Sequence, residues 1–399
     1  MTLVGPSDPV LDLTRELIAI DSVNPGLVPG AAGERAIALH LAARLTAGGF
    51  DVELVEAPSD PRRVSVLAVW SGARSGRTVV LNGHLDTVGV EGMPEPFVPR
   101  IDGERLIGRG ASDMKGGVAG IVVAAEQLVR RDVPGRVVVA LVADEEDASI
   151  GAVAVLERLR ARDIAADVCL IAEPTWLDLT AAHRGFALYA VMMTGRAAHS
   201  SQPELAVDVM PALARLLADV GMFDAGLRER GLHPLLPSGS LMTTVARAGS
   251  APFTVAAHAE LAIERRTVPG EAVDVGRTEL ELLLAGLGDE FPGVTASIET
   301  VVARSAWHLD ASGAAAELAD LLAAGLASGG RRAGRTGAPY WMESALWQEA
   351  GVPTVVCGPA GGGLHAVDEW VDLDQLRLFP VVVTEALEKF LGMPVPSCP

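Results

Sequence analysis

Metal-ligating types of side chain follow four separate apolar segments of this chain. The segments and the residues after them are 78–81 with His84, 136–142 with Glu145 and Glu146, 167–171 with Glu173, and 353–357 with His365. The segments are rich in Val and Ile and bounded by turn residues, a pattern typical of strands buried on both faces of a parallel sheet. Ligands of open α/β sheets bind at the carboxyl ends of strands, so these side chains are expected to converge at one edge.

Predicted helices alternate with these strands along the chain. The stretches read as helical are 9–20, 33–48 and 117–131. Strand–helix alternation predicts an α/β domain with a mostly parallel sheet flanked by helices. Residues 185–296 differ, because short strands and two helices form a compact α+β pattern there. We therefore predict one domain from residues 1–184 and 297–399, interrupted by an inserted domain at 185–296.

Charge and apolar patterning exclude several classes of partner. The net charge of -19 argues against a nucleic-acid or anionic-membrane surface. No apolar run approaches the 18 or so residues that span a bilayer, and the start of the chain lacks the pattern of a signal peptide.

The three cysteines, Cys169, Cys357 and Cys398, are widely spaced and show no disulfide or zinc pattern, so we expect them to be inert. A cytoplasmic location is expected.

Asp113 is a fifth candidate ligand. It lies in a glycine-rich loop before the predicted helix at 117–131, where a carboxylate bridging two cations would fit. Two His, two Glu and one Asp suit Zn²⁺, with Co²⁺ or Mn²⁺ as possible substitutes. Two metals about 3.5 Å apart need one shared carboxylate and two further ligands each, a count that five residues meet. One acidic residue of the Glu145–Glu146 pair is then left to act as a base.

Structural interpretations compete with these functional ones. Glu145 and Glu146 lie between Asp144 and Asp147 and so could form a solvated acidic turn, but the preceding buried-type strand favours catalysis. His183 lies at the expected domain junction, where hinge support is the preferred interpretation and support of a ligand the alternative. The histidines outside any motif are interpreted as structural: His40, His233, His258 and His308.

Seven segments carry a resemblance to a known family. They are NGHLDTV, PFVPRIDGERLIGRGASDMKGG, ADEED, AEPT, GRAAHSSQPE, ERRTVPG and GLHAVDEW. In this order, over nearly the whole chain, they resemble the two-zinc peptidase and amidohydrolase family of acetylornithine deacetylase, succinyl-diaminopimelate desuccinylase, aminoacylase and glutamate carboxypeptidase. The resemblance implies a zinc-dependent exopeptidase-like fold.

The resemblance also implies a role for each candidate ligand. His84 and Glu173 would hold one zinc, Glu146 and His365 would hold the other, and Asp113 would bridge them. The peptide bond after Asp113 is often cis in the family, a form rare outside proline.

Further residues near the ligands receive roles in the same way. Asp86 would orient the imidazole of His84, since a ligating His usually has such a partner. Glu145 would take a proton from the bridging water and later deliver it to the leaving nitrogen.

The inserted domain resembles the family's lid, which implies a homodimer formed through it. His199 matches a lid histidine that hydrogen-bonds the oxyanion. Arg266 matches a lid arginine that clamps the substrate carboxylate, although Arg265 beside it could take that role.

Three positions depart from the family pattern. They are Ala360 in GPA, Glu343 in YWMESAL, and Asp208 where an Asn is usual. None is a predicted metal ligand, so they bear on the substrate and not on the chemistry.

The predicted activity is hydrolysis of the amide bond of an N-acyl amino acid by a metal-bridged hydroxide, as in a deacetylase or desuccinylase. A dipeptidase or carboxypeptidase acting on short peptides is the first alternative. A non-catalytic dimeric binding homologue is the second, although none of the expected ligands or the base is missing.

Overall fold

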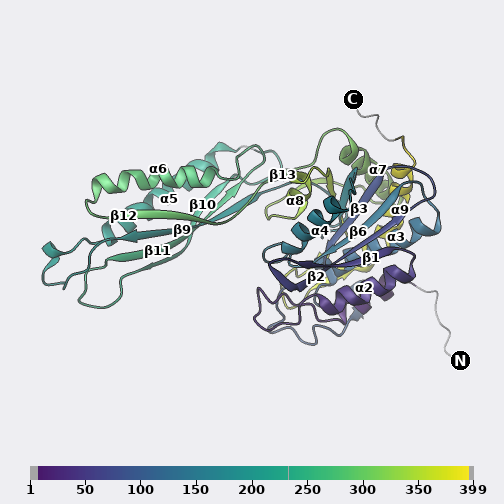
Figure 1. The fold of residues 1–399 in the computed structure, drawn as a ribbon, viewed down its shortest axis with the longest axis horizontal. Coiled ribbons are helices and arrows are strands. Elements are labelled where there is room, and N and C mark those ends of the chain that lie inside the picture. Colours follow the sequence, from purple (N-terminus) through teal and green to yellow (C-terminus); the bar gives the residue numbers. More distant parts are fainter. Residues whose placement is uncertain (1–7, 232, 395–399) are drawn as a thin grey trace. The chain divides into compact units, whose positions relative to one another are not determined.

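The structure is a computed structural model that describes residues 8–231 and 233–394, so Cys398 lies outside the described residues. The chain divides into two compact units. The first comprises the described residues up to Ala181, Leu309–Thr336, and the described residues from Leu346 onward; the second comprises Ala182–His308 and Gly337–Ala345. Figure 1 shows the strands and helices of each unit.

A large mixed sheet organises the first unit. Its order is β1–β2–β6–β3–β7–β15–β8–β13, with β14 also paired to β8. The bounds are β1 (Asp51–Ala57), β2 (Asp60–Ser71), β3 (Thr78–His84), β6 (Arg136–Val142), β7 (Val168–Ile171), β8 (Leu179–His183), β13 (Trp307–His308), β14 (Arg335–Ala338) and β15 (Thr354–Val356). The four central strands, β6, β3, β7 and β15, are parallel. Every residue of β3, β7 and β15 is buried, as expected for Val-rich strands covered on both faces.

The first unit also contains helices, of which α8 begins in the second unit. Their bounds are α1 (Pro9–Ile18), α2 (Arg35–Ala47), α3 (Gly116–Arg130), α4 (Ile150–Ala161), α7 (Ala314–Ser328), α8 (Ser344–Glu349) and α9 (Leu373–Leu391). α3 packs against β3 and β6, α7 against β7 and β15, and α2 and α4 against β1 and β2. The predicted fold class, a sheet with a parallel centre flanked by helices, is confirmed. Among the described helices, none is long and apolar enough to cross a membrane.

A smaller antiparallel sheet joins two distant parts of the chain. It has the order β16–β17–β5–β4, formed by β4 (Arg100–Asp102), β5 (Arg105–Ile107), β16 (Gly361–Gly362) and β17 (Trp370–Asp372). Pairing of β17 with β5 aligns Trp370 with Ile107. The segment that contains His365 is thereby brought beside the loop that leads to Asp113.

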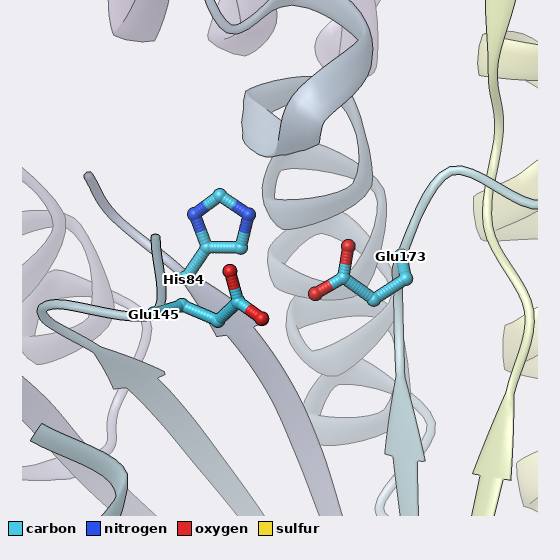
Figure 2. A group of neighbouring side chains, drawn as sticks. All are labelled: His84, Glu145 and Glu173. Carbon is cyan, nitrogen blue, oxygen red and sulfur yellow. The ribbon is translucent and has the colours of Figure 1, made fainter. Parts of the chain in front are cut away.

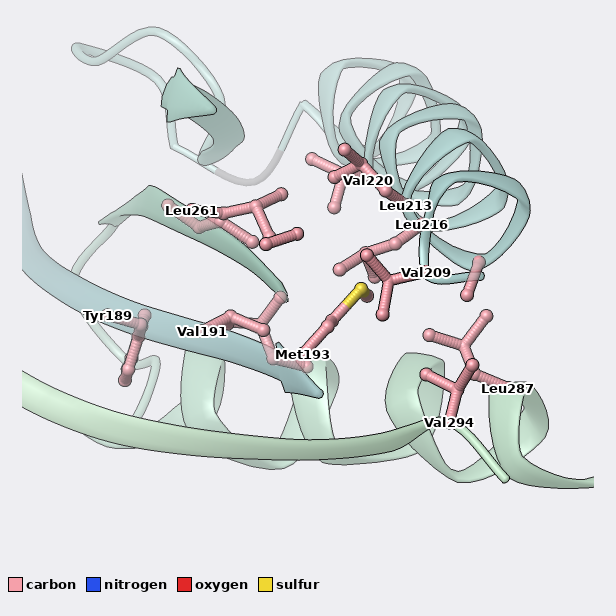
Figure 3. Packing of buried hydrophobic residues seen from close by; sticks show 14 of the residues in the cluster. Tyr189, Val191, Met193, Val209, Leu213, Leu216, Val220, Leu261, Leu287 and Val294 are labelled. Carbon is pink, nitrogen blue, oxygen red and sulfur yellow. The ribbon is translucent and has the colours of Figure 1, made fainter. Parts of the chain in front are cut away.

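The second unit is a sheet with helices α5 (Met210–Arg230) and α6 (Val275–Glu290) packed on it. Its strands are β9 (Gly185–Thr194), β10 (Ser240–Ala248), β11 (His258–Thr267) and β12 (Thr295–Arg304), in the order β10–β11–β9–β12. Alternate residues of β9 are buried, which is the pattern of a sheet covered on one face. Figure 3 shows Tyr189, Val191 and Met193 of β9 among the apolar side chains of this core.

The unit boundaries differ from the predicted residue numbers. The expected boundary after residue 296 falls inside β12, which pairs with β9 from Thr295 to Arg304 and therefore belongs to the second unit. Residues Gly337–Ala345 also join that unit, where the Ser344 hydroxyl lies 2.8 Å from Nε2 of His183. Whether the two units act as a metal-binding domain and a lid stays a prediction.

Candidate metal centre

The carboxyl ends of the central strands carry the predicted ligands. His84 is the last residue of β3, Glu145 and Glu146 follow β6, and Glu173 follows β7. Their backbones therefore lie on adjacent strands at one edge of the sheet. In Figure 2, the carboxylates of Glu145 and Glu173 point toward the space beside the imidazole of His84. One ligand atom from each of these three residues lies within 4.8 Å of the others.

Asp113 lies between two imidazoles. It lies in the turn Ala111–Lys115 that precedes α3, where the backbone angles of Asp113 and Met114 are not helical, and its peptide bond to Met114 is cis, as the family resemblance implied. Oδ1 of Asp113 lies 3.0 Å from Nε2 of His84, and Oδ2 lies 3.4 Å from Nε2 of His365. Each carboxylate oxygen thus faces a different histidine, which is the arrangement expected of a bridging ligand.

His365 is the remaining candidate ligand. It follows β16 and its Nε2 lies 3.2 Å from Oε2 of Glu146. One ligand atom from each of His84, Asp113 and Glu146 also lies within 4.8 Å of the others. The structure therefore brings together all five predicted ligands and the predicted base, Glu145.

The electrostatics of the cluster favour cations. Burial, together with the charges of Asp113 and Glu146, raises the pKa of Glu173 to about 8 despite the opposing effect of His84. Hydrogen bonds to Asp113 and Glu146 raise the pKa of His365 to about 10. Burial also raises the pKa of Glu146, and its Oε1 is a buried atom with no hydrogen-bond partner among the described residues. Crowded carboxylates with an unsatisfied oxygen fit a pair of divalent cations.

Asp86 supports the site through both its carbonyl and its carboxylate. Nδ1 of His84 lies 3.0 Å from the backbone oxygen of Asp86 and 3.6 Å from its Oδ1. The carboxylate instead accepts the backbone N–H groups of Glu145 and Glu146, each at 3.1 Å. The hydrogen bond expected to orient His84 thus comes from the Asp86 carbonyl, while the carboxylate fixes the loop after β6.

A buried polar network behind Asp86 was not predicted. The side-chain amide of Asn24 donates to Asp86 at 2.7 Å and to Asp144 at 3.1 Å. The guanidinium of Arg63 lies 2.7 Å from Asp144 and pairs with Glu34. Burial raises the pKa of Glu34 and of Asp144, while Arg63 opposes the increase in both. The sequence signal nearest to this network is the polar Asn24-Pro25-Gly26 turn, which follows the helix predicted at 9–20.

The two predicted lid residues belong to the second unit. Nδ1 of the exposed His199 lies 2.8 Å from Oγ of Ser201. The Arg266 guanidinium lies 5.2 Å from the ring centroid of Phe186 and donates to Glu264 at 2.5 Å. Arg265 is fully buried and pairs with two glutamates, Glu271 and Glu279, so its contacts are those of a structural residue.

The remaining predicted residues have structural surroundings. His183 is fully buried in the second unit and its ring stacks on Trp307 with centroids 5.5 Å apart. The half-buried His40 lies beside Glu16, and the exposed His258 lies beside Glu260. Cys169 and Cys357 are buried and form no disulfide within the described part of the chain.

Sequence comparisons agree with this arrangement. A model of peptidase family M20/M25/M40 matches residues 80–389. A succinyl-diaminopimelate desuccinylase of Dinoroseobacter shibae is 30% identical over 400 residues, covering 97% of this chain and 100% of that protein. Succinyl-diaminopimelate desuccinylase 2 of Ruegeria sp. is 34% identical over 251 residues, 60% of each chain.

Solved structures share the fold at low identity. The aminopeptidase PepT from Bacillus cereus superposes with a TM-score of 0.76 at 17% identity, covering 96% of this chain and 98% of that one. The YXEP protein of Bacillus subtilis, described as a dinuclear metal-binding peptidase, superposes with a TM-score of 0.72 at 17% identity. The match covers 96% of this chain and 97% of that one. The chain belongs to peptidase family M20/M25/M40 and is a metal-dependent enzyme that hydrolyses amide bonds.

Proposed function

We propose that this enzyme hydrolyses the amide bond of an N-acyl amino acid and releases a carboxylate and a free amine. The observation that carries the proposal is the placement of Asp113 between the imidazoles of His84 and His365, with Glu145 beside His84. The desuccinylase names of relatives that align over nearly the whole chain support this substrate class.

Two zinc ions are the proposed cofactors, with Co²⁺ or Mn²⁺ able to replace them. His84 and Glu173 would hold one ion, Glu146 and His365 the other, and Asp113 both. When bound, the ions polarise the substrate carbonyl and lower the pKa of a water molecule.

Glu145 is the proposed general base. Its backbone N–H is held by Oδ1 of Asp86, so the side chain extends from a fixed anchor toward His84 and Glu173. The carboxylate would accept a proton from the attacking water and deliver it to the leaving nitrogen, so one group acts as base and then as acid.

The second unit would supply substrate contacts. We propose that His199 donates a hydrogen bond to the developing oxyanion and that Arg266 binds the substrate carboxylate, a task suited to the planar guanidinium fork. Arg266 is the half-exposed member of the Arg265–Arg266 pair, which supports this choice. A homodimer formed through this unit and a cytoplasmic location belong to the same proposal.

A substrate panel tests the proposed activity. The zinc-loaded and cobalt-loaded enzymes would be assayed against N-acetyl and N-succinyl amino acids and against dipeptides. We expect turnover of the N-acyl compounds to exceed that of dipeptides. Preferential cleavage of dipeptides would favour the peptidase alternative, and no turnover of any compound would favour the binding homologue. Light scattering of the purified protein would check the dimer.

A Glu145→Ala variant tests the assignment of the base. We expect it to lose turnover while elemental analysis still finds about two metal ions per chain, because the five proposed ligands remain. Retained activity would rule out Glu145 as the base.

A further inference from the structure

A buried carboxylate holds the loop that presents Asp113. Glu369 is 1% exposed, and its Oε1 accepts the backbone N–H groups of Ser112 at 2.9 Å and of Asp113 at 3.0 Å. Its Oε2 accepts the N–H of Gly110 at 2.9 Å and Nη1 of Arg109 at 2.8 Å. Four donors, three of them in buried hydrogen bonds, therefore converge on one side chain, and removing it would leave them unsatisfied at considerable cost.

The backbone of Glu369 is tied to the same region. Its carbonyl accepts the N–H of Gly108 at 3.2 Å, and the residues after it form β17, which pairs with β5. His365 lies in the same chain segment and contacts both Asp113 and Glu146. The segment from His365 to Glu369 thus carries one candidate ligand, His365, and also the residue that fixes the loop of another candidate ligand, Asp113.

The two histidines differ in how they are supported. The side chain of His84 is 1% exposed and its Nδ1 lies 3.0 Å from the carbonyl oxygen of Asp86. The side chain of His365 is 55% exposed and its Nε2 lies near Asp113 and Glu146. The position formed by His365 and Glu146 therefore depends more on a correctly placed Asp113 than the position at His84 does.

We propose that Glu369 is a positioning residue that sets the bridging geometry of Asp113 and thereby the affinity of the metal position at His365 and Glu146. This inference rests on the proposed two-metal centre. Residues that orient metal ligands from outside the coordination sphere commonly change metal affinity by about 10–100-fold when mutated.

Stepwise Co²⁺ binding to the chelator-stripped full chain tests this role. Calorimetry and the visible absorption of bound Co²⁺ would be followed for the wild type and for Glu369→Gln, which keeps the side-chain shape but turns one acceptor into a donor. We expect two equivalents in the wild type. In the variant, the first equivalent should bind as in the wild type and the second at least about 10-fold more weakly.

Glu279→Gln is the control variant. Glu279 is also buried, at 9% exposed, and accepts two hydrogen bonds from Arg265 within the second unit. This variant should lose thermal stability yet bind both equivalents with wild-type affinity. Comparison of the two variants distinguishes the effect of a misplaced ligand from the effect of losing any buried Glu–Arg pair.

Two results would overturn the inference: unchanged binding of both equivalents by Glu369→Gln, or equal weakening of both. If this variant does not fold, Glu369→Asp, which keeps the charge but shortens the reach, is judged by the same criteria. A wild-type protein that takes up fewer than two equivalents would remove the proposed metal centre itself, so the two failures are distinguishable.

Discussion

Oδ1 of Asp86 accepts the backbone N–H of Glu145 at 3.1 Å, so the proposed base is anchored to a residue that also contacts His84. Replacing Asp86 with Asn would place an amide N–H₂ group against backbone donors. We expect Asp86→Asn to lower kcat by about 10–100-fold, because the loop after β6 that carries Glu145 loses its anchor, although the backbone carbonyl that contacts His84 remains. Steady-state kinetics on an N-acyl amino acid would measure the effect.

Asp167 provides a control for Asp86. It accepts the backbone N–H of Thr78 at 2.6 Å, at the opposite end of β3 from His84. Asp167→Asn removes a hydrogen bond of the same type, so it should leave kcat unchanged even if stability falls. Equal loss of kcat in the two variants would contradict a specific role for Asp86.

Arg63 is expected to be important for stability. It is the cation that faces the buried carboxylates of Glu34 and Asp144, and its side chain is 5% exposed. Removing one partner of a buried ion pair typically costs about 3–5 kcal/mol, so Arg63→Met should lower the free energy of unfolding by about that amount. Urea denaturation followed by circular dichroism would measure it.

The stability of the Arg63→Met variant should also depend on pH in a defined direction. Burial already raises the pKa of Glu34 and Asp144 in the folded state, and loss of the guanidinium raises it further. Stability is therefore regained as the pH falls through these raised pKa values and lost as the pH rises. Arg62→Met is the control, because Arg62 is 84% exposed and pairs with Asp60 at the surface; it should show no such dependence.

The contrast between these two arginines shows where sequence analysis stops. Residues 62 and 63 are identical neighbours in the sequence, yet one is exposed and the other buried. The partners of Arg63 lie elsewhere in the chain, at Glu34 and Asp144, so no local pattern distinguishes it. The metal ligands could be predicted because each one follows a strand or precedes a helix, and parallel strands bring such positions to one edge.

The same argument explains the domain boundary. β3, β6, β7 and β15 could be predicted because burial on both faces requires an apolar run. β12 could not, because none of its residues is fully buried and it therefore carries no such run. Its place in the second unit depends on pairing with β9, a long-range contact that an apolar pattern does not reveal.

His183 is expected to make the second unit sensitive to acid. Burial lowers the pKa of His183 to about 4, from an ordinary value of 6.5. The folded state thus holds a neutral imidazole, and the unfolded state takes up a proton first as the pH falls. The stability that this group contributes above about pH 6.5 is lost as the pH falls from about 6.5 to about 4. The free energy of unfolding should decrease by about 2 kcal/mol from pH 7 to pH 5.

Urea titrations at pH 7 and pH 5 would compare the wild type with His183→Gln, which keeps a polar side chain near Ser344. The variant should lose less stability between the two pH values than the wild type. His258→Gln, at an exposed position, should behave as the wild type does. Identical pH dependence in all three proteins would show that His183 is not the titrating group.

Removal of metal is expected to destabilise the first unit selectively. Asp113, Glu146 and Glu173 place buried carboxylates close together, and bound cations would neutralise their repulsion. A site at which free metal is 100 times its Kd stabilises the folded state by about 2.7 kcal/mol. The core of the second unit is formed by its own strands and helices, which carry none of the five proposed ligands. Differential scanning calorimetry with and without a chelator should therefore show one transition that moves to lower temperature and one that does not. Equal shifts of both transitions, or a thermogram that chelation leaves unchanged, would contradict a metal centre confined to the first unit.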